Sequence, residues 1–410
     1  MIAAVWGIES PRLIAALTRV VRSIDLAEEL AQDAFLAALE QWPKEGVPSK
    51  PGAWLTSVAK RRAIDRFRRE KTAAQKREEL GRATGSESYE PDFTGLDHEI
   101  GDDLLRLMFV ACHPVLSVEA RLALTLRLLG GLSTPEIARA FLISEPTVAQ
   151  RIVRAKRTLA EARVPFGVPD ARERAERLSS VLEVIYLIFN EGYSATAGDD
   201  VLRPALCQEA MRLGRVLAEM QPHETEVHGL VALMEIQASR MKARVGPSGE
   251  HILLFDQDRA RWDHFLIRRG LAALDRANEC SGPLGKYTLQ AAIAACHARA
   301  RIGDETDWAR IAALYDALAQ LTPTPVVELN RAVAIGMAFG PAAGLELVDA
   351  LISSPTLQSY HLLPSVRGDL LEKLQRFSEA SAEFERAAEL AQNARDRDLL
   401  LLRAARCTHA

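Results

Sequence analysis

The sequence predicts an all-α protein made of several helical units. Apolar residues recur at intervals of three and four along most of the 410 residues, which is the period of an amphipathic helix. The chain is 48% hydrophobic, 26% charged and only 6% aromatic, a composition that suits a soluble and mostly helical protein. A chain of this length has room for two or three domains, each with its own core.

Three helices are predicted in the N-terminal part. Apolar residues share one face of the first two: Leu13, Leu17, Val20, Val21 and Ile24, then Leu26, Leu30, Ala34 and Ala38. A break is expected from Trp42 to Pro48, where Pro43 and Gly46 interrupt the pattern. A third helix should start near Pro51, because proline is tolerated in a first helical turn.

The charge is unevenly distributed along the chain. The net charge is −4, and residues 1–165 hold 24 basic and 22 acidic residues against 27 and 33 in residues 166–410. Residues 59–77 hold nine basic and two acidic residues, whereas 78–103 hold nine acidic residues and one basic. Charge blocks of this kind indicate binding partners rather than a fold, and the basic block favours nucleic acid. The candidate DNA-binding residues there are Lys60, Arg61, Arg62, Arg66 and Arg69, while we expect Trp54 to be a core residue.

A helix-turn-helix is predicted in the next part. Residues 81–97 lack periodicity and read as a linker, and a second helical unit follows over 99–164. After Gly130-Gly131, a short helix runs from a Ser133/Thr134 cap to Phe141. The next helix is capped by Ser144, has Pro146 in its first turn and ends near Ala162.

The second of these helices has two distinct faces. Val148, Ile152, Ala155 and Leu159 fall on one face, which should pack inward. The opposite face suits the major groove of DNA, where Gln pairs with adenine, Arg with guanine and Val meets a thymine methyl group. It carries Thr147, Gln150, Val153, Arg154 and Arg157, and flanking positions for phosphate contact hold Arg151 and Lys156.

A long helical extension follows Pro169. Near its end, residues 332–344 and 368–380 match at an offset of 36 residues, a period typical of tetratricopeptide-like helical hairpins. The predicted packing face of the last hairpin is Phe377, Ala380, Phe384, Ala387 and Ala388. Since such repeats usually present a binding surface, regulation by a protein or peptide is expected. Residues 187–194 and 256–263 form either a polar pocket or, as we favour, interdomain contacts or capped turns.

Other classes of protein are disfavoured. Five scattered cysteines without a CxxC pair argue against a disulfide framework, and the Cys112-His113 and Cys296-His297 pairs lack the spacing of a metal site, so no metal or other cofactor is expected. No stretch reaches the roughly 18 apolar residues of a membrane helix, and no secretory signal is apparent, which predicts a cytoplasmic protein. No constellation of catalytic residues supports an enzyme.

The motifs together resemble those of bacterial sigma factors of the extracytoplasmic-function (ECF) type. Residues 27–35 resemble the region 2 helix that binds polymerase, and 52–55 with 63–66 resemble the helix that opens and reads the −10 element. Residues 132–138 and 147–157 resemble region 4, which reads the −35 element. Regions 1 and 3 of housekeeping sigma factors have no counterpart, and the extension resembles the tetratricopeptide-like tail of one subgroup.

This resemblance implies a promoter-specific initiation factor that is not an enzyme. Region 2 would occupy 1–72, an acidic linker 73–98, region 4 99–164 and a regulatory extension 170–410. Region 4 would dock on the β flap of core RNA polymerase and bind promoter DNA, and a regulatory protein could bind the extension. The residues implied to bind the β′ clamp helices are Glu28, Glu29, Gln32, Asp33 and Phe35. The alternatives are a helix-turn-helix activator with a helical-repeat sensor, and a protein-binding scaffold.

Overall fold

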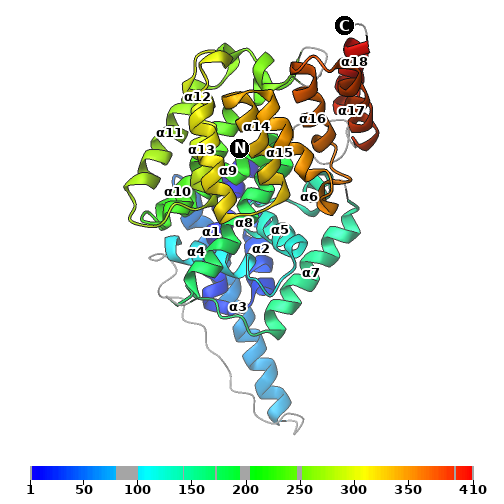
Figure 1. The fold of residues 1–410 in the computed structure, drawn as a ribbon. Coiled ribbons are helices and arrows are strands. Elements are labelled where there is room, and N and C mark those ends of the chain that lie inside the picture. The colour runs from blue at the N-terminus through cyan, green and yellow to red at the C-terminus, as the bar shows by residue number, and fades with distance from the viewer. Residues whose placement is uncertain are drawn as a thin grey trace. The chain divides into compact units, whose positions relative to one another are not determined.

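The computed structural model confirms the all-α fold class. It describes residues 2–79, 100–141, 143–170, 173–193, 204–246, 252–391 and 394–408, and every regular element in those ranges is helical (Figure 1). The chain divides into two compact units, Met1–Val184 and Ile185–Ala410. The four-part division expected from the sequence stays a prediction, and most of its acidic linker (residues 80–98) lies outside the described residues.

The first unit contains seven helices and the first half of an eighth: α1 (Ile2–Val21), α2 (Ile24–Glu45), α3 (Pro51–Glu79), α4 (Ile100–Ala111), α5 (Val118–Leu128), α6 (Thr134–Phe141), α7 (Glu145–Glu161) and α8 (Arg174–Tyr193).

The second unit holds the rest of α8 and ten further helices: α9 (Pro204–Met220), α10 (Thr225–Ser239), α11 (His264–Glu279), α12 (Lys286–Arg299), α13 (Trp308–Leu321), α14 (Pro325–Phe339), α15 (Pro341–Leu351), α16 (Leu362–Lys373), α17 (Phe377–Leu390) and α18 (Ala394–Thr408). Short 3-10 turns lie between them: η1 (Met241–Ala243), η2 (Leu254–Asp256), η3 (Arg259–Arg261), η4 (Gly303–Glu305) and η5 (Pro355–Leu357).

The first three helices form a small bundle whose apolar stripes are buried as predicted. Leu17, Leu30 and Leu55, one from each helix, are at most 2% exposed. The predicted break from Trp42 was wrong by one turn, because α2 continues to Glu45 with Pro43 inside it. Trp42 is buried and makes an edge contact with Trp54 at 5.3 Å, so packing holds this last turn despite the proline.

Helices α6 and α7 form the predicted helix-turn-helix, and each has a capped start. Ser133 and Glu136 make a reciprocal capping box, since each side chain accepts a hydrogen bond from the backbone N–H of the other residue. The Ser144 hydroxyl accepts from the Thr147 N–H, which caps α7 as predicted. Leu142, in the predicted turn, lies outside the described residues.

In most of the second unit each helix packs against its neighbours in sequence, and α10 also packs closely against α12. Its predicted 36-residue repeat corresponds to two helical hairpins, α14–α15 and α16–α17, and within each pair the helices lie side by side (Figure 1). Gly368 permits the close approach of the second pair, because a Cβ there would lie 2.8 Å from the Phe384 ring. The predicted packing face is confirmed: Ala380, Phe384 and Ala387 are fully buried.

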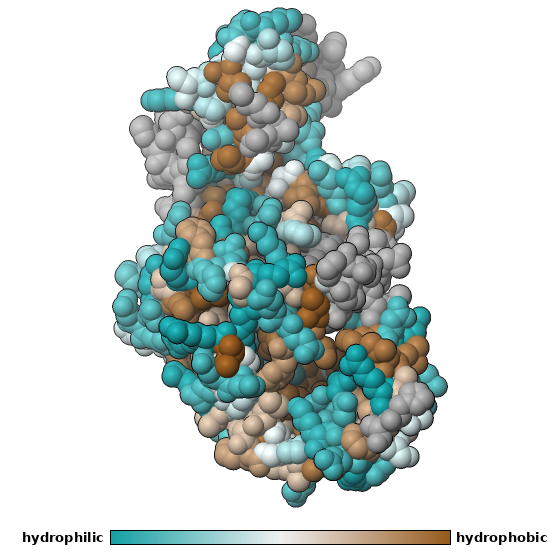
Figure 2. Space-filling model, turned by 90° about the horizontal axis from the view of Figure 1, so that it is seen from above, coloured by the Kyte–Doolittle hydropathy of each residue, from teal (hydrophilic) through white to brown (hydrophobic). Residues whose placement is uncertain are grey.

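Hydrophilic residues cover much of the face seen in Figure 2, and hydrophobic residues are interspersed among them. Within the described ranges, no helix combines the length and the apolar character needed to cross a membrane.

Candidate nucleic-acid interface

Helix α7 presents the side chains that the sequence assigned to base reading. Val148, Ile152, Ala155 and Leu159 are buried as predicted, which fixes the rotation of the helix about its axis. The opposite face is exposed at all five predicted positions: Thr147, Gln150, Val153, Arg154 and Arg157. Val153 is 65% exposed, so its methyl groups are accessible on this face. Arg157 is paired with Glu161 on its own helix, at 2.6 Å.

The two flanking residues predicted to contact phosphate are placed differently from each other. Arg151 is half-buried, whereas Lys156 turns toward α2 and pairs with two carboxylates. Its Nζ lies 2.7 Å from Asp25 Oδ1 and 2.8 Å from Glu28 Oε2. Burial opposes the charged form of Lys156, but hydrogen bonds to Asp25 and Glu28 outweigh burial and raise its pKa. In this arrangement Lys156 binds protein rather than phosphate.

Helix α3 carries the predicted basic surface, and part of it is also engaged by α2. Arg61 and Arg69 are exposed, and Lys60 is half-buried. Arg62 pairs with Asp33 at 3.1 Å, and Arg66 pairs with Glu29 at 2.7 Å. These two pairs are 40% exposed or more on both sides, so each contributes little to stability.

Three of the residues predicted to bind polymerase form an acidic ridge on α2 together with Asp25, which was not among them. We use the name acidic ridge for Asp25, Glu28, Glu29 and Asp33. Of the predicted polymerase-binding set, Glu29 and Gln32 are exposed, Asp33 is half-buried, and Phe35 stacks on Trp6 at 4.5 Å. Glu28 is only 7% exposed, because Arg127 of α5 and Lys156 of α7 lie against it.

The ridge thus has cations on both sides within the first unit. Arg127 pairs with Glu28 at 2.6 Å, and a separate pair joins Arg19 of α1 to Asp103 of α4 at 2.9 Å. Asp103 is 1% exposed, so this second link, between α1 and α4, is buried on the carboxylate side. No local sequence pattern indicates these contacts, because partners such as Glu28 and Lys156 lie 128 residues apart.

The structure shows the elements to which residues 187–194 and 256–263 of the extension belong. Asp258 caps η3 and Asp263 caps α11, so residues 256–263 contain capped turns as favoured. Arg259 secures this turn by donating to the His297 and Ala300 carbonyl oxygens, and it lies over the Trp262 ring. In residues 187–194, the part up to Tyr193 lies in α8, and Ser194 is outside the described residues.

The cysteine-histidine pairs show no sign of metal chemistry. In the ranges that the structure describes, no group of three or more His, Cys, Asp or Glu residues could hold an ion. Burial raises the pKa of the Cys112 thiol to about 11, and burial also raises that of Cys296. Both thiols are thus protonated at neutral pH and pack as small apolar groups, with Cys112 1% and Cys296 6% exposed.

Comparison with known proteins identifies the parts of the chain. Residues 8–72 match the sigma-70 region 2 family, 106–159 match sigma-70 region 4, and 177–278 match a family of unknown function, DUF6596. The matched segments contain the acidic ridge, the basic residues of α3 from Lys60 to Arg69, and most of helix α7. The exposed face of α7 is thus part of a region 4 helix-turn-helix.

Relatives cover either the whole chain or its first part. An uncharacterized protein of Rhizobium meliloti (strain 1021) is 46% identical over 386 residues, which cover 94% of this chain and 90% of that protein. The ECF RNA polymerase sigma factor SigK of Mycobacterium sp. (strain KMS) is 31% identical over 157 residues, 37% of this chain and 76% of SigK. SigK of Mycobacterium ulcerans (strain Agy99) is 28% identical, over 36% of this chain and 78% of that protein. No solved structure matches the chain.

These similarities agree with the structure. Regions 2 and 4 occur in the order and places where the sequence motifs predicted them, and the helical-repeat activator is not favoured, since an activator has no need of region 2. Sigma factors bind core RNA polymerase and promoter DNA. The chain belongs to the extracytoplasmic-function RNA polymerase sigma factors and carries a helical C-terminal extension.

Proposed function

We propose that the chain directs core RNA polymerase to its promoters through three helices. The acidic ridge of α2, with Gln32 and Phe35, would bind the β′ clamp helices, and the region 4 segment would bind the β flap. Helix α3 would contact the −10 element, and the exposed face of α7 the −35 element. The observation that carries this proposal is the exposure of Gln150, Val153 and Arg154 opposite a fully buried face.

In terms of this proposal, the arrangement of the first unit is closed: α3 and α7 lie too near each other to reach both promoter elements. The −10 and −35 elements are named for positions about 25 base pairs apart, and at about 3.4 Å per base pair this is roughly 85 Å of duplex. In the first unit, however, α3 and α7 are linked through consecutive residues of α2: Arg66 holds Glu29, and Lys156 holds Glu28. Two helices bridged by a pair of neighbouring side chains cannot reach both elements at once.

Polymerase binding would require this contact to break. Glu28 cannot meet the clamp helices while Lys156 and Arg127 cover it, and Lys156 cannot meet phosphate while Glu28 and Asp25 hold it. We infer that opening uncovers Glu28, the buried member of the acidic ridge, for polymerase and releases Lys156 to the DNA backbone. The two proposed uses of Glu28 and Lys156 are thus coupled, and both stay blocked in the closed arrangement.

The C-terminal extension would be the regulatory part of the protein. Its stacked helical hairpins resemble repeats that present a surface to protein partners, which supports a regulatory partner there. We propose that the protein as a whole acts in the cytoplasm as a regulator of transcription and has no catalytic role of its own.

Binding of purified core RNA polymerase tests the acidic ridge. Asp33→Arg places a cation in the ridge at a half-exposed position, and we expect it to abolish core binding while the circular dichroism spectrum stays helical. Arg154→Gln, which alters the DNA-reading face alone, is the matched control and should bind core enzyme normally. Equal binding by both variants would contradict the assignment of the ridge to polymerase.

Charge reversal at the contact tests the closed arrangement. Lys156→Glu would repel Asp25 and Glu28 and should favour the open form, so we expect tighter binding to core polymerase than that of the wild type. Transcription from a −10/−35 promoter by the full-length chain and by wild-type protein truncated after Val184, where the first unit ends, would then show how the extension acts. A Lys156→Glu protein that binds core polymerase more weakly would argue against closure as a block.

A further inference from the structure

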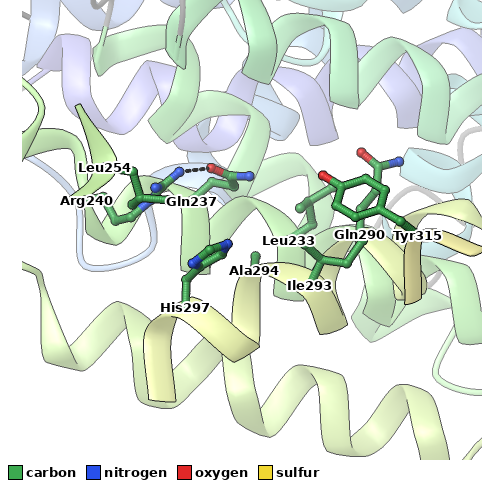
Figure 3. A pocket seen from close by; sticks show the side chains of 9 residues that line it. All are labelled: Leu233, Gln237, Arg240, Leu254, Gln290, Ile293, Ala294, His297 and Tyr315. Carbon is green, nitrogen blue, oxygen red and sulfur yellow. Dashed lines mark hydrogen bonds between the residues drawn. The ribbon is translucent and has the colours of Figure 1, made fainter. Parts of the chain in front are cut away.

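A cavity of about 210 Å³ lies inside the second unit. Helices α10, α12 and α13 form its walls together with the turn η2, and Figure 3 shows the nine side chains that line it. Four of them are apolar, and they give the cavity a hydrophobic wall: Leu233, Leu254, Ile293 and Ala294. The sequence motifs gave no indication of this site, because its residues come from segments that are far apart in the chain.

Polar groups with unused hydrogen-bonding capacity line the rest of the cavity. Arg240 donates to Tyr193 Oη at 2.8 Å and to Gln237 Oε1 at 2.7 Å, and both bonds use Nη2. Among the described residues, its Nε and Nη1 have no protein acceptor, and the Tyr315 hydroxyl and the His297 ring have no hydrogen-bond partner. Gln290 accepts from Tyr186 at 3.3 Å, which leaves its amide N–H₂ to donate.

The cavity has a single formal charge in its lining. The lining includes no aspartate or glutamate in the described part of the chain, and both described hydrogen bonds of Arg240 go to uncharged acceptors. Burial, with the nearby Arg240 and Arg259, lowers the pKa of His297 to about 4, and burial raises the pKa of Tyr315 to about 12. At neutral pH both are therefore uncharged, and Arg240 supplies one positive charge.

Size, charge and polarity together define the ligand class. A planar guanidinium with two free donor groups matches the two oxygens of a carboxylate. A phosphate dianion would bring one negative charge too many for this lining. An apolar protein cavity of about 150 Å³ accommodates benzene, so about 210 Å³ has room for a ring or branched chain plus one carboxylate.

We propose that this cavity binds a small monocarboxylate whose apolar body is about the size of a benzene ring. The carboxylate pairs with Arg240 and the body packs on Leu233 and Ile293, while Gln290 and Tyr315 line the other end of the cavity (Figure 3). The inference does not rest on the proposed function, because binding requires neither polymerase nor promoter.

Calorimetric titration of the full-length protein with benzoate and with benzamide tests this proposal. Benzamide has the same ring and size but no charge, so we expect it to bind at least roughly tenfold more weakly, the value of a charge-assisted hydrogen bond. Arg240→Gln should weaken benzoate binding by a similar factor and make the two affinities equal. Arg268→Gln removes an exposed cation of α11 and is the matched control, with unchanged binding.

A second variant keeps the test decisive if Arg240→Gln does not fold. Ala294→Leu fills the cavity from α12 and should abolish binding of both compounds, while the helical circular dichroism stays unchanged. The proposal is overturned if benzoate does not bind, if it binds Ala294→Leu as tightly as the wild type, or if inorganic phosphate binds as tightly as benzoate. Equal affinities of benzoate and benzamide for the wild type would also overturn it.

Discussion

Lys156 of α7 and Glu28 of α2 lie 2.8 Å apart, and their side chains are only 12% and 10% exposed. Both belong to sets that the sequence assigned to external partners, Glu28 to polymerase and Lys156 to DNA phosphates. In the first unit they bind each other instead. Under the proposed function, this one contact excludes polymerase from Glu28 and DNA phosphates from Lys156 at the same time.

Loss of Lys156 should destabilise the first unit. Lys156→Met leaves Asp25 unpaired among the described residues and removes one of the two cations at the buried Glu28. We therefore expect the free energy of unfolding to fall by about 1–3 kcal/mol. Urea unfolding measures this change. Arg154→Ala on the same helix is the control, since an exposed residue should shift stability by no more than about 0.5 kcal/mol.

Arg154→Ala should change promoter choice, whereas Lys156→Met should not. Arg154→Ala should cost about 1–3 kcal/mol of promoter binding and relax the base preference at one −35 position, because an exposed arginine of α7 can bind a guanine edge. Competition binding with single-base promoter variants measures both effects. An unchanged preference at every −35 position would mean that Arg154 contacts no base.

Removal of the α7 cap should weaken the recognition helix. Ser144→Ala deletes the acceptor of the Thr147 N–H bond and the hydroxyl contact with Thr147 at 2.7 Å, for a cost of about 1 kcal/mol. Thermal unfolding monitors the loss. Ser144→Asp keeps a capping acceptor and should retain the stability of the wild type, so a loss of equal size in this variant would show that capping is not the cause.

Acid should destabilise the second unit through His297. Its folded pKa of about 4 lies below the ordinary value of 6.5, so the unfolded chain binds the proton more tightly and stability falls as the pH drops from 6.5 toward 4. Between pH 7 and pH 5 this single group should cost about 2 kcal/mol. The comparison is with His297→Gln, whose unfolding should change less over the same interval; identical pH profiles would rule out His297 as the source.

The contact between α10 and α12 leaves no room for a methyl group at Gly229. A Cβ at Gly229 would lie 2.3 Å from Thr288 Oγ1 and 2.7 Å from the Thr288 backbone nitrogen. Gly229→Ala should therefore force the helices apart at a cost of about 1–3 kcal/mol, seen as a lower melting temperature. Gly167→Ala has open space around it and should leave the melting temperature unchanged or slightly higher.

The sequence by itself determined the helices of the first unit and the orientation of α7. Ser133 and Ser144 mark helix starts through local hydrogen bonds, and the spacing of Val148, Ile152 and Leu159 fixes which face is buried. Both signals act within a few residues. The continuation of α2 through Pro43 was missed, because the packing of Trp42 on Trp54 decides it, and that contact joins two separate helices.

Only the tertiary structure decided which side chains meet across long stretches of chain. It paired Lys156 with Glu28, and it brought Arg240, His297 and Tyr315 to one cavity. A sequence pattern reports the face on which a residue lies but not the element that packs against that face. Partner choice depends on how all helices share the buried volume, and that is settled only when the unit has folded.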